Sequence, residues 1–353
     1  MPKVKIVGID LFCGAGGLSY GLKSAGIDVH AGIDLDPACE FPFEKNIGAP
    51  FIRADIRKIV SGDLRQYYPK GAISLLAGCA PCQPFSSFRR GTDNSGDEKW
   101  GLLLEFGRLV KELRPDLITM ENVPGLAKQP VFLKFLTDIE GEGYSVKVKS
   151  IFGPSYGLPQ YRRRLVLIGS RIGPAYLPEA TLKSDQYLCV KSAIHDLPPL
   201  KAGETDKADP LHRARALTPL NLRRIRSSVQ GGTWRDWPDE LRSPCHRKKT
   251  GASFQSVYAR MSWDLPSPTI TTQSFNFGTG RFGHPDQDRP ISLREAAILQ
   301  SFPKNYRFVA TDADISFSNV GRLIGNAVPP ALGKAIGAAL IKCVEGRTMP
   351  GAT

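Results

Sequence analysis

Cys82 sits in a proline-bracketed turn, Gly78-Cys79-Ala80-Pro81-Cys82-Gln83-Pro84, directly after an apolar run. A thiol fixed at the carboxyl end of a buried strand faces the crevice in which open α/β sheets bind ligands, so it is well placed to act as a nucleophile. An inert buried thiol is the alternative role. The spacing Cys79-x-x-Cys82 also matches a redox pair. No other cysteine has the spacing that a structural zinc site needs, so we predict no metal.

Glu121 and a pair of arginines add acid–base and electrostatic chemistry. Glu121 closes the apolar run Leu117–Val123, where partial desolvation favours the protonated carboxyl group, which can donate a hydrogen bond to a ring nitrogen. Gln160-Tyr161-Arg162-Arg163-Arg164 precedes another apolar run, and strand alternation places Arg162 and Arg164 on one face. Two fixed guanidinium groups can bind a carbonyl oxygen or a phosphate, although a solvated strand start is the simpler interpretation.

A glycine-rich turn, Asp10–Leu18, follows the first apolar run and opens a helix. Its glycines let a ligand approach the backbone, and the helix start offers N–H groups to an anion. Ser19 stands where a dinucleotide fingerprint would have its last glycine, so a carboxylate, such as that of a methionine moiety, fits as well as a pyrophosphate. Asp34 can accept hydrogen bonds from ribose hydroxyls, Leu35 can cover an adenine, and Asp55-Ile56 can meet the adenine amino group.

The elements that position these residues alternate between strands and helices. We predict strands at Lys5–Leu11, Val29–Asp34, Phe51–Ile56, Ala72–Gly78, Leu117–Val123, Ser145–Ile151 and Leu165–Ser170. We predict helices at Gly17–Ala25, Pro37–Asn46, Leu102–Leu113, Leu293–Gln300 and Pro330–Cys343. The fold class is therefore α/β, with a doubly wound, mostly parallel sheet. Residues 1–180 plus 318–353 would form the sheet domain, and residues 181–317 a smaller, irregular domain and hinge.

Charge is concentrated in that irregular region. The 353-residue chain carries a formal net charge of +13, and residues 201–260 hold 13 Lys or Arg against 6 Asp or Glu. Trp234, Trp237 and Trp263 lie in or beside this stretch. A basic, loop-rich segment with aromatic residues suits nucleic-acid recognition, because cations contact phosphates and other side chains reach base edges. A solvated loop region is the alternative. Without a signal-peptide pattern or a run of 18 apolar residues, we expect a cytoplasmic, nucleoid-associated protein with no membrane contact.

The chain resembles the bacterial-type C5-cytosine DNA methyltransferases over nearly its whole length. The resemblance rests on six segments in the family's order: Asp10–Leu18, Pro81-Cys82-Gln83, Glu121-Asn122-Val123, Gln160-x-Arg162-x-Arg164, Arg260 before Pro268-Thr269-Ile270-Thr271, and Gly325-Asn326-Ala327-Val328. It implies a Rossmann-like methyltransferase sheet with a target-recognition domain in the variable basic region. It also implies a monomer that acts on double-stranded DNA, with a restriction endonuclease as a separate companion in some relatives.

The same resemblance implies a role for each site residue. Cys82 would be the nucleophile, Glu121 would grip the cytosine N3 and amino edge, Arg164 would hold the carbonyl oxygen, and Arg162 would support the active-site loop. S-adenosylmethionine would lie against a set of residues from three strand ends and the C-terminal segment. This set is Phe12, Gly14, Gly16, Gly17, Asp34, Leu35, Asp55, Ile56, Asn326 and Val328. Leu35 departs from the family, in which an aromatic residue often covers the adenine.

The implied mechanism is thiolate addition at C6 of a cytosine extruded from the duplex, followed by methylation at C5. The polar loop Phe85–Lys99 is expected to close over the base. Three other functions compete with this one, and the intact set Cys82, Glu121, Arg162 and Arg164 argues against an inactive relative. An RNA cytosine methyltransferase of the same family would act on tRNA, and an inactive relative would only bind DNA. A nicotinamide-dependent oxidoreductase conflicts with Ser19 and leaves Pro81-Cys82-Gln83 unexplained. The recognised DNA sequence depends on side chains that the sequence does not place in the groove.

Overall fold

The computed structural model describes residues 5–80, 100–248 and 257–346. Its contacts divide the chain into two compact units. Unit 1 comprises residues 1–152, 163–181 and 328–353, and unit 2 comprises residues 153–162 and 182–327. The first break falls beside the predicted boundary at 180. Residues 153–162 and 318–327, which we assigned to the sheet domain, group with unit 2 instead. The functions given to the two parts stay predictions.

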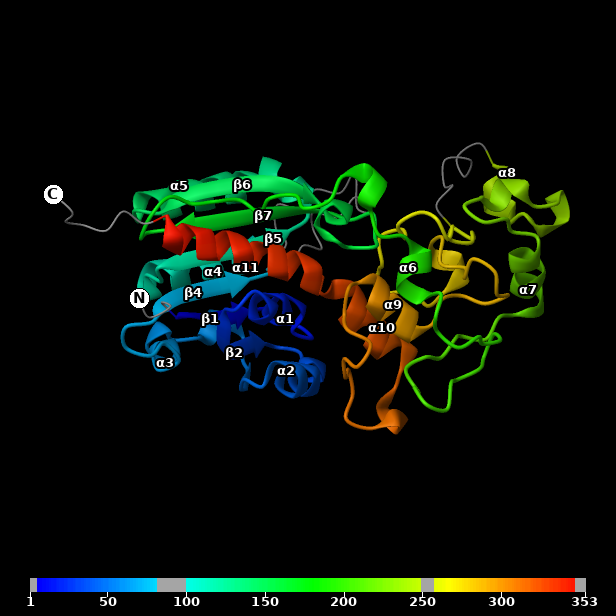
Figure 1. The fold of residues 1–353 in the computed structure, drawn as a ribbon, viewed down its shortest axis with the longest axis horizontal. Helices are drawn as coiled ribbons and strands as arrows, with labels where there is room; N and C mark the ends of the chain where they lie inside the picture. Colours follow the sequence, from blue (N-terminus) through cyan, green and yellow to red (C-terminus); the bar gives the residue numbers. More distant parts are fainter. Residues whose placement is uncertain (1–4, 81–99, 249–256, 347–353) are drawn as a thin grey trace. The chain divides into compact units, whose positions relative to one another are not determined.

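Unit 1 is built on one seven-stranded sheet with the order β3-β2-β1-β4-β5-β7-β6. The first five strands of the chain pair in parallel, whereas β7 is antiparallel to both β5 and β6. The strands are β1 (Ile6–Leu11), β2 (Asp28–Asp34), β3 (Phe51–Arg53), β4 (Ile73–Gly78), β5 (Leu117–Asn122), β6 (Ser145–Phe152) and β7 (Arg163–Ser170). The predicted mostly parallel, doubly wound α/β sheet is confirmed (Figure 1).

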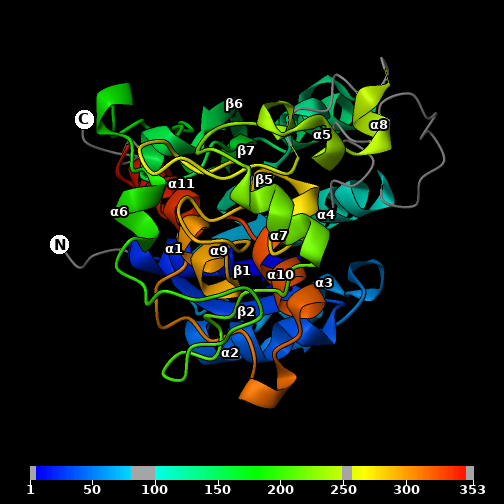
Figure 2. The ribbon, with the colours of Figure 1, turned by 90° about the vertical axis from the view of Figure 1, so that its right-hand side faces the viewer.

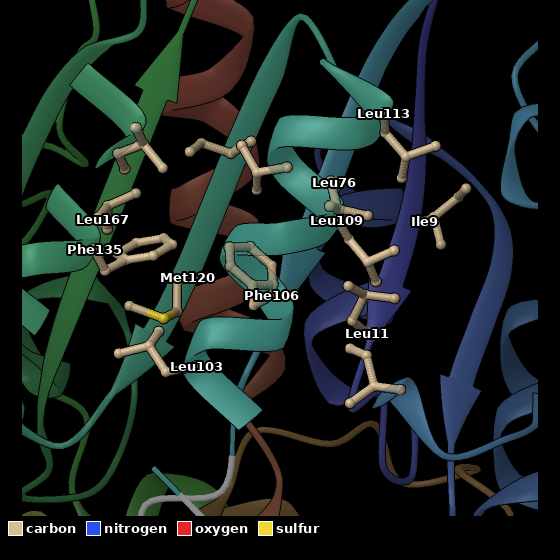
Figure 3. Close-up of a cluster of buried hydrophobic side chains, with 14 of the residues drawn as sticks. Ile9, Leu11, Leu76, Leu103, Phe106, Leu109, Leu113, Met120, Phe135 and Leu167 are labelled. Atoms are coloured by element: carbon tan, nitrogen blue, oxygen red, sulfur yellow. The ribbon is translucent and has the colours of Figure 1, made fainter. Parts of the chain in front are cut away.

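Helices cover both faces of this sheet. They are α1 (Gly17–Ser24), α2 (Glu40–Ile47), α3 (Ser61–Arg65), α4 (Trp100–Leu113), α5 (Pro130–Gly141) and α11 (Pro330–Glu345). Helix α4 packs with α3 and α5, and α11 packs with α1. Figure 3 views the sheet from the α4 side, with α11 behind it. The central strands β1, β4 and β5 are apolar on both faces because they are buried along almost their whole length.

The core between α4 and the sheet follows from helical periodicity. Leu103, Phe106, Leu109 and Leu113 recur at intervals of three or four residues, so they form one apolar stripe along α4 (Figure 3). These side chains are buried against residues such as Leu76 of β4. Full burial of an aliphatic or aromatic side chain contributes about 1.5–3 kcal/mol, so this stripe fixes α4 over the central strands.

Helices α1 and α11 meet through glycines. A Cβ atom on Gly21 would lie 2.4 Å from the Pro330 carbonyl oxygen, and one on Gly333 would lie 2.8 Å from the Leu18 carbonyl oxygen. Both neighbours are backbone atoms, which cannot move aside like a flexible side chain. Glycine is therefore required for this close approach, which attaches the last helix of the unit to the element that begins at the glycine-rich turn.

Unit 2 has little regular structure. Its helices are α6 (Val190–Ile194), α7 (Pro219–Arg226), α8 (Pro244–Arg247), α9 (Leu293–Leu299) and α10 (Phe317–Asn326). Long irregular segments join these short helices (Figure 2). A small core of buried side chains holds the basic region together: Ile225, Trp234, Trp237, Leu241 and Phe277. Trp234 and Trp237 therefore have structural roles, which a tryptophan count alone does not reveal.

Two predicted elements have different bounds in the structure, and helix α5 was not predicted. The expected strand Phe51–Ile56 ends at Arg53, because Asp55 caps a 3-10 turn by accepting a hydrogen bond from the Arg57 backbone N–H. The expected helix Pro37–Asn46 begins as a 3-10 turn and becomes α2 only at Glu40. Helix α5 was not predicted, although its buried phenylalanines at positions 132 and 135 have helical spacing.

One segment of the described chain, residues 317–345, is long and apolar enough to cross a membrane by length and composition. It comprises α10 and α11, and 67% of its most apolar window is buried within the structure. Burial of this kind is consistent with core helices, whose apolar side chains pack against protein.

Candidate active site

The glycine-rich turn brings backbone atoms to the carboxyl ends of β1 and β2. Phe12 and Gly14 adopt φ values of 58° and 53°, and Gly16, the N-cap of α1, adopts 86°. The Gly14 N–H donates to Asp34 Oδ2 at 2.9 Å, which ties the turn to the end of β2. A Cβ atom on Gly14 would meet nothing within 4 Å, so the backbone there borders open space. Gly17 begins α1 and no side chain caps this helix.

Asp34 and Leu35 lie together at the end of β2. Asp34 also accepts a hydrogen bond from the Asp36 backbone N–H at 3.0 Å, so both of its oxygens are oriented by backbone donors. Burial raises the pKa of this carboxyl group above its usual value. The Leu35 side chain, in contrast, is 60% exposed. The end of β2 therefore presents an oriented carboxylate next to an exposed apolar side chain.

Asp10 is a site residue that the sequence reasoning did not include. It is buried at the end of β1, and its Oδ2 accepts a hydrogen bond from the Ser19 hydroxyl at 2.6 Å. Within the described residues its Oδ1 has no hydrogen-bond partner. Burial raises the Asp10 pKa to about 7. Ser19, at the position of the last glycine in a dinucleotide fingerprint, therefore donates a hydrogen bond to the buried Asp10 carboxyl group. The sequence signal for this contact was an aspartate near the end of an apolar strand.

Asp55 and Ile56 take positions different from those predicted. Because β3 ends at Arg53, Asp55 lies at the start of a 3-10 turn rather than on the strand. Its carboxylate receives hydrogen bonds from the Arg57 guanidinium at 2.6–3.0 Å, which lower its pKa. Ile56 is buried. Asp55 therefore has an arginine partner that a ligand amino group would have to displace or share.

Glu121 and Arg164 meet across neighbouring strands. In the antiparallel β5–β7 pair, Glu121 lies opposite Val166, so Arg164 at the start of β7 comes beside the end of β5. Arg164 Nε lies 3.0 Å from Glu121 Oε1, and Cys79 Sγ lies 3.2 Å from Glu121 Oε2. The Glu121 side chain is only 3% exposed. The sheet therefore builds a buried carboxyl group flanked by a cation and a thiol.

Asn122 anchors the segment that leads toward Cys82. Its Nδ2 donates to the Ala80 carbonyl oxygen at 3.1 Å, while its Oδ1 accepts from the Val123 backbone N–H at 2.8 Å. Cys82 itself lies outside the described residues, as does the loop Phe85–Lys99 that was expected to cover the base. The first described stretch of the chain therefore ends at Ala80, which lies beside β5 and two residues before the predicted nucleophile.

Arg162 is the centre of a buried cluster in unit 2. Its guanidinium donates to the carbonyl oxygens of Ile270 at 3.3 Å and Ala327 at 3.2 Å. Gln160 Nε2 donates to Gln300 Oε1, and Gln160 Oε1 accepts from the Ile270 backbone N–H. These contacts join the segments around residues 160, 270 and 327, which are three of the six that carried the family resemblance.

Arg162 lies just before β7, which begins at Arg163, and the two arginines contact different parts of the chain. Arg162 contacts backbone carbonyls of unit 2, and Arg164 contacts Glu121 of unit 1. Asn326 ends α10 with an exposed side chain, whereas Val328 is buried and precedes α11. The Arg164 guanidinium therefore lies beside a buried carboxyl group, whereas the Arg162 guanidinium holds backbone carbonyl oxygens.

The arginines of α7 also differ from one another. Arg223 and Arg226 are about two-thirds exposed, at 63% and 62%. Arg224 is buried, donates to the Leu241 carbonyl oxygen at 2.9 Å, and stacks on Trp237 and Tyr258. Basic residues in this region are therefore of two kinds, and only the exposed ones can meet a polyanion.

Three comparisons with known proteins point to the same family. Residues 6–342 match the family model described as C-5 cytosine-specific DNA methylase. The chain is 46% identical to the type II methylase M.HgiDII of Herpetosiphon aurantiacus over 96% of both chains. It is 33% identical to the type II methyltransferase M.PspPI of a Psychrobacter species, covering 96% of this chain and 79% of that protein. A prophage-encoded protein of E. coli, assigned as a DNA modification methyltransferase, shares the fold with a TM-score of 0.71 at 22% identity, covering 97% of this chain and all of that one.

Proposed function

Because the chain belongs to the C-5 cytosine-specific DNA methylase family, we propose that it transfers a methyl group from S-adenosylmethionine to C5 of a cytosine in a specific double-stranded DNA sequence. The observation that carries this proposal is the buried Glu121–Arg164 pair at the end of β5, beside the segment that leads to Cys82. A carboxyl group and a guanidinium set side by side match the N3, amino and carbonyl edge of cytosine.

The ends of β1 and β2 fit the methyl donor. Gly14 borders open space, so the backbone can approach a bound molecule, and the uncapped start of α1 offers N–H groups to a carboxylate. Asp34 presents a carboxylate to ribose hydroxyls, and the exposed Leu35 offers an apolar surface to adenine. When bound, S-adenosylmethionine supplies an electrophilic methyl group. Phe12, Gly16, Gly17, Asp55, Ile56, Asn326 and Val328 complete the proposed set.

Cys82 supplies the nucleophile in the proposed reaction. C5 of cytosine is unreactive while the ring is aromatic, and addition of the Cys82 thiolate to C6 makes C5 electron-rich. Glu121 donates a proton or hydrogen bond at N3, and Arg164 stabilises negative charge on the carbonyl oxygen. S-adenosylmethionine would supply the methyl group and would be left as S-adenosylhomocysteine. Once C5 carries the methyl group, loss of the C5 proton to a base, for which we propose water, and departure of the Cys82 thiolate restore the aromatic ring, and any proton held at N3 returns to Glu121.

The target cytosine must leave the duplex for this chemistry. Its C6 is covered by stacking within DNA, so extrusion costs a few kcal/mol that contacts to the flipped base and to the remaining duplex must offset. In unit 2, the exposed Arg223 and Arg226 are suited to phosphate contacts, whereas the buried Arg224 is not. We assign Arg162 a supporting role through its contacts with the Ile270 and Ala327 backbone.

The decisive experiment uses a duplex that contains 5-fluorocytosine at the target position. Fluorine at C5 cannot leave as a proton does, so the proposed intermediate persists and the wild-type chain should become covalently attached to the DNA when S-adenosylmethionine is present. Cys82→Ser should form no adduct while retaining affinity for DNA, and Glu121→Gln should form it far more slowly. Cys343→Ala, a thiol lost from α11, is the matched control. Absence of an adduct with the wild-type chain on its mapped target contradicts the proposal.

The substrate is identified separately. Base-resolution mapping of methylation in DNA from cells that express the chain should show 5-methylcytosine in one sequence context, and purified protein should transfer labelled methyl groups to duplex DNA rather than to tRNA. Transfer to tRNA alone would replace the DNA assignment with the RNA alternative. The type II names of the relatives lead us to propose that the chain acts as a monomeric partner of a separately acting restriction endonuclease.

A further inference from the structure

Cys79 contacts Glu121 but takes no part in the reaction proposed above. Its Sγ donates to Glu121 Oε2 at 3.2 Å. Gly78 pairs with Met120 in the parallel β4–β5 ladder, so the next residues along the two chains, Cys79 and Glu121, lie side by side. We propose that Cys79 is a positioning residue that fixes the orientation of the Glu121 carboxyl group. This inference rests on the proposed function, because it concerns the group assigned to grip cytosine.

The Glu121 carboxyl group has few other restraints. Arg164 Nε lies 3.0 Å from Oε1, yet within the described residues this oxygen has no hydrogen-bond partner of acceptable geometry. An ion pair without a directed hydrogen bond tolerates rotation of the carboxyl group, whereas a hydrogen bond to one oxygen does not. The hydrogen bond from the Cys79 thiol therefore fixes the position of Oε2. Oε1 keeps its hydrogen-bonding capacity for the edge of the base.

The thiol is not needed to hold the backbone in this region. Asn122 Nδ2 donates to the Ala80 carbonyl oxygen at 3.1 Å, and the Cys79 backbone N–H donates to the Leu11 carbonyl oxygen at 3.3 Å. Neither contact involves the Cys79 side chain. The side chain is half-buried, which separates it from the inert core thiols of Cys13 and Cys39. Replacing the Cys79 side chain should therefore change the orientation of the Glu121 carboxyl group more than the backbone conformation.

The test compares Cys79→Ala, which removes the donor, with Cys79→Ser, whose hydroxyl can donate to the same oxygen. A hydrogen bond to an ionised or protonated carboxyl group that matters during the reaction is worth about a tenfold change in rate. We expect kcat of Cys79→Ala to fall about tenfold while KM for DNA and for S-adenosylmethionine stays within about twofold, because the group acts on the reacting base. Cys79→Ser should recover kcat to within about threefold of wild type. Cys343→Ala should match wild type.

A double-mutant cycle tests whether Cys79 acts through Glu121. In the Glu121→Gln background, Cys79→Ala should cost less than about threefold, because the group it positions has already been altered. Full additivity overturns the inference, as does an unchanged kcat in Cys79→Ala or a Cys79→Ser variant as slow as Cys79→Ala. If Cys79→Ala does not fold, Cys79→Val, which fills the space without a donor, takes its place in the same comparisons.

Failure of this inference can be distinguished from failure of the proposed function. Wild-type protein and Cys79→Ala are both offered the 5-fluorocytosine duplex with S-adenosylmethionine. A wild-type chain that forms no adduct contradicts the proposed function. A wild-type chain that forms the adduct no faster than Cys79→Ala contradicts only the positioning role. A slower adduct in Cys79→Ala and recovery in Cys79→Ser support it.

Discussion

Replacement of Arg162 by alanine should destabilise unit 2. Its guanidinium donates to two buried carbonyl oxygens, at Ile270 and Ala327, and its side chain is almost fully buried. Hydrogen bonds from a charged donor are each worth about 1.5–3 kcal/mol, so losing both costs about 3–6 kcal/mol. Gln300 Nε2 lies 3.5 Å from the Ala327 oxygen and can compensate in part, which places the expected loss near the lower end of that range.

Arg162→Lys provides the graded comparison. A single ammonium group can reach one of the two carbonyl oxygens, so we expect about half of the alanine effect. Urea unfolding gives the free-energy change, and hydrogen–deuterium exchange locates it. Exchange should rise in peptides that contain Ile270 and Ala327 and remain unchanged in β1 and β4 of unit 1. An unfolding free energy for Arg162→Ala within about 1 kcal/mol of wild type would refute the structural role given to this arginine.

Three further predictions follow from burial and close contact. Gly21→Ala should lower the thermal midpoint of unit 1 by several degrees, since its Cβ would lie 2.4 Å from the Pro330 carbonyl oxygen; Gly62→Ala, on a helix with open space, is the control. Burial lowers the pKa of His284 to about 4, so stability should fall as pH drops from 6.5 toward 4, and His284→Asn should flatten that dependence in urea titrations. Burial raises the pKa of Asp10 from 3.8 to about 7, so the free energy of unfolding should fall as pH rises from 3.8 to 7. Asp10→Asn, which carries no charge, should therefore be more stable than wild type at pH 8.

A fourth prediction in this group concerns DNA binding. Reversing Arg223 and Arg226 to glutamate should weaken DNA binding and reduce the slope of log K against log salt by about one per lost phosphate contact, whereas Lys134→Glu on α5 should not; equal slopes in the two variants would place the DNA-contacting face elsewhere.

The sheet could be predicted because its signals are local. Several predicted strands are apolar runs that end at a polar or glycine residue, and Asp34 and Gly78 mark the ends of β2 and β4 correctly. Buried parallel strands are apolar throughout, so their position along the chain is easy to read. The same locality explains why α5 was missed. It has no side-chain cap, and its apolar residues resemble those of a buried strand over short windows.

The site could be predicted only in part, because side-chain partners come from distant parts of the chain. Asp55 was predicted to lie on the third strand, but that strand ends at Arg53, and Asp55 instead pairs with Arg57 in a 3-10 turn. Arg162 and Arg164 are two residues apart in sequence and yet belong to different compact units. The Cys79–Glu121 contact spans 42 positions and arises from strand register, which no local pattern encodes.

The attachment of α11 to α1 has a consequence for synthesis of the protein. Helix α11 follows all of unit 2 along the chain, so α1 leaves the ribosome long before its partner exists. At about 5–20 residues per second, the roughly 300 intervening residues delay that partner by about 15–60 s. During this interval the glycine face of the nascent helix stays uncovered. A newly made chain therefore completes unit 1 only after the whole of unit 2 has emerged, which couples maturation of the sheet unit to synthesis of the other.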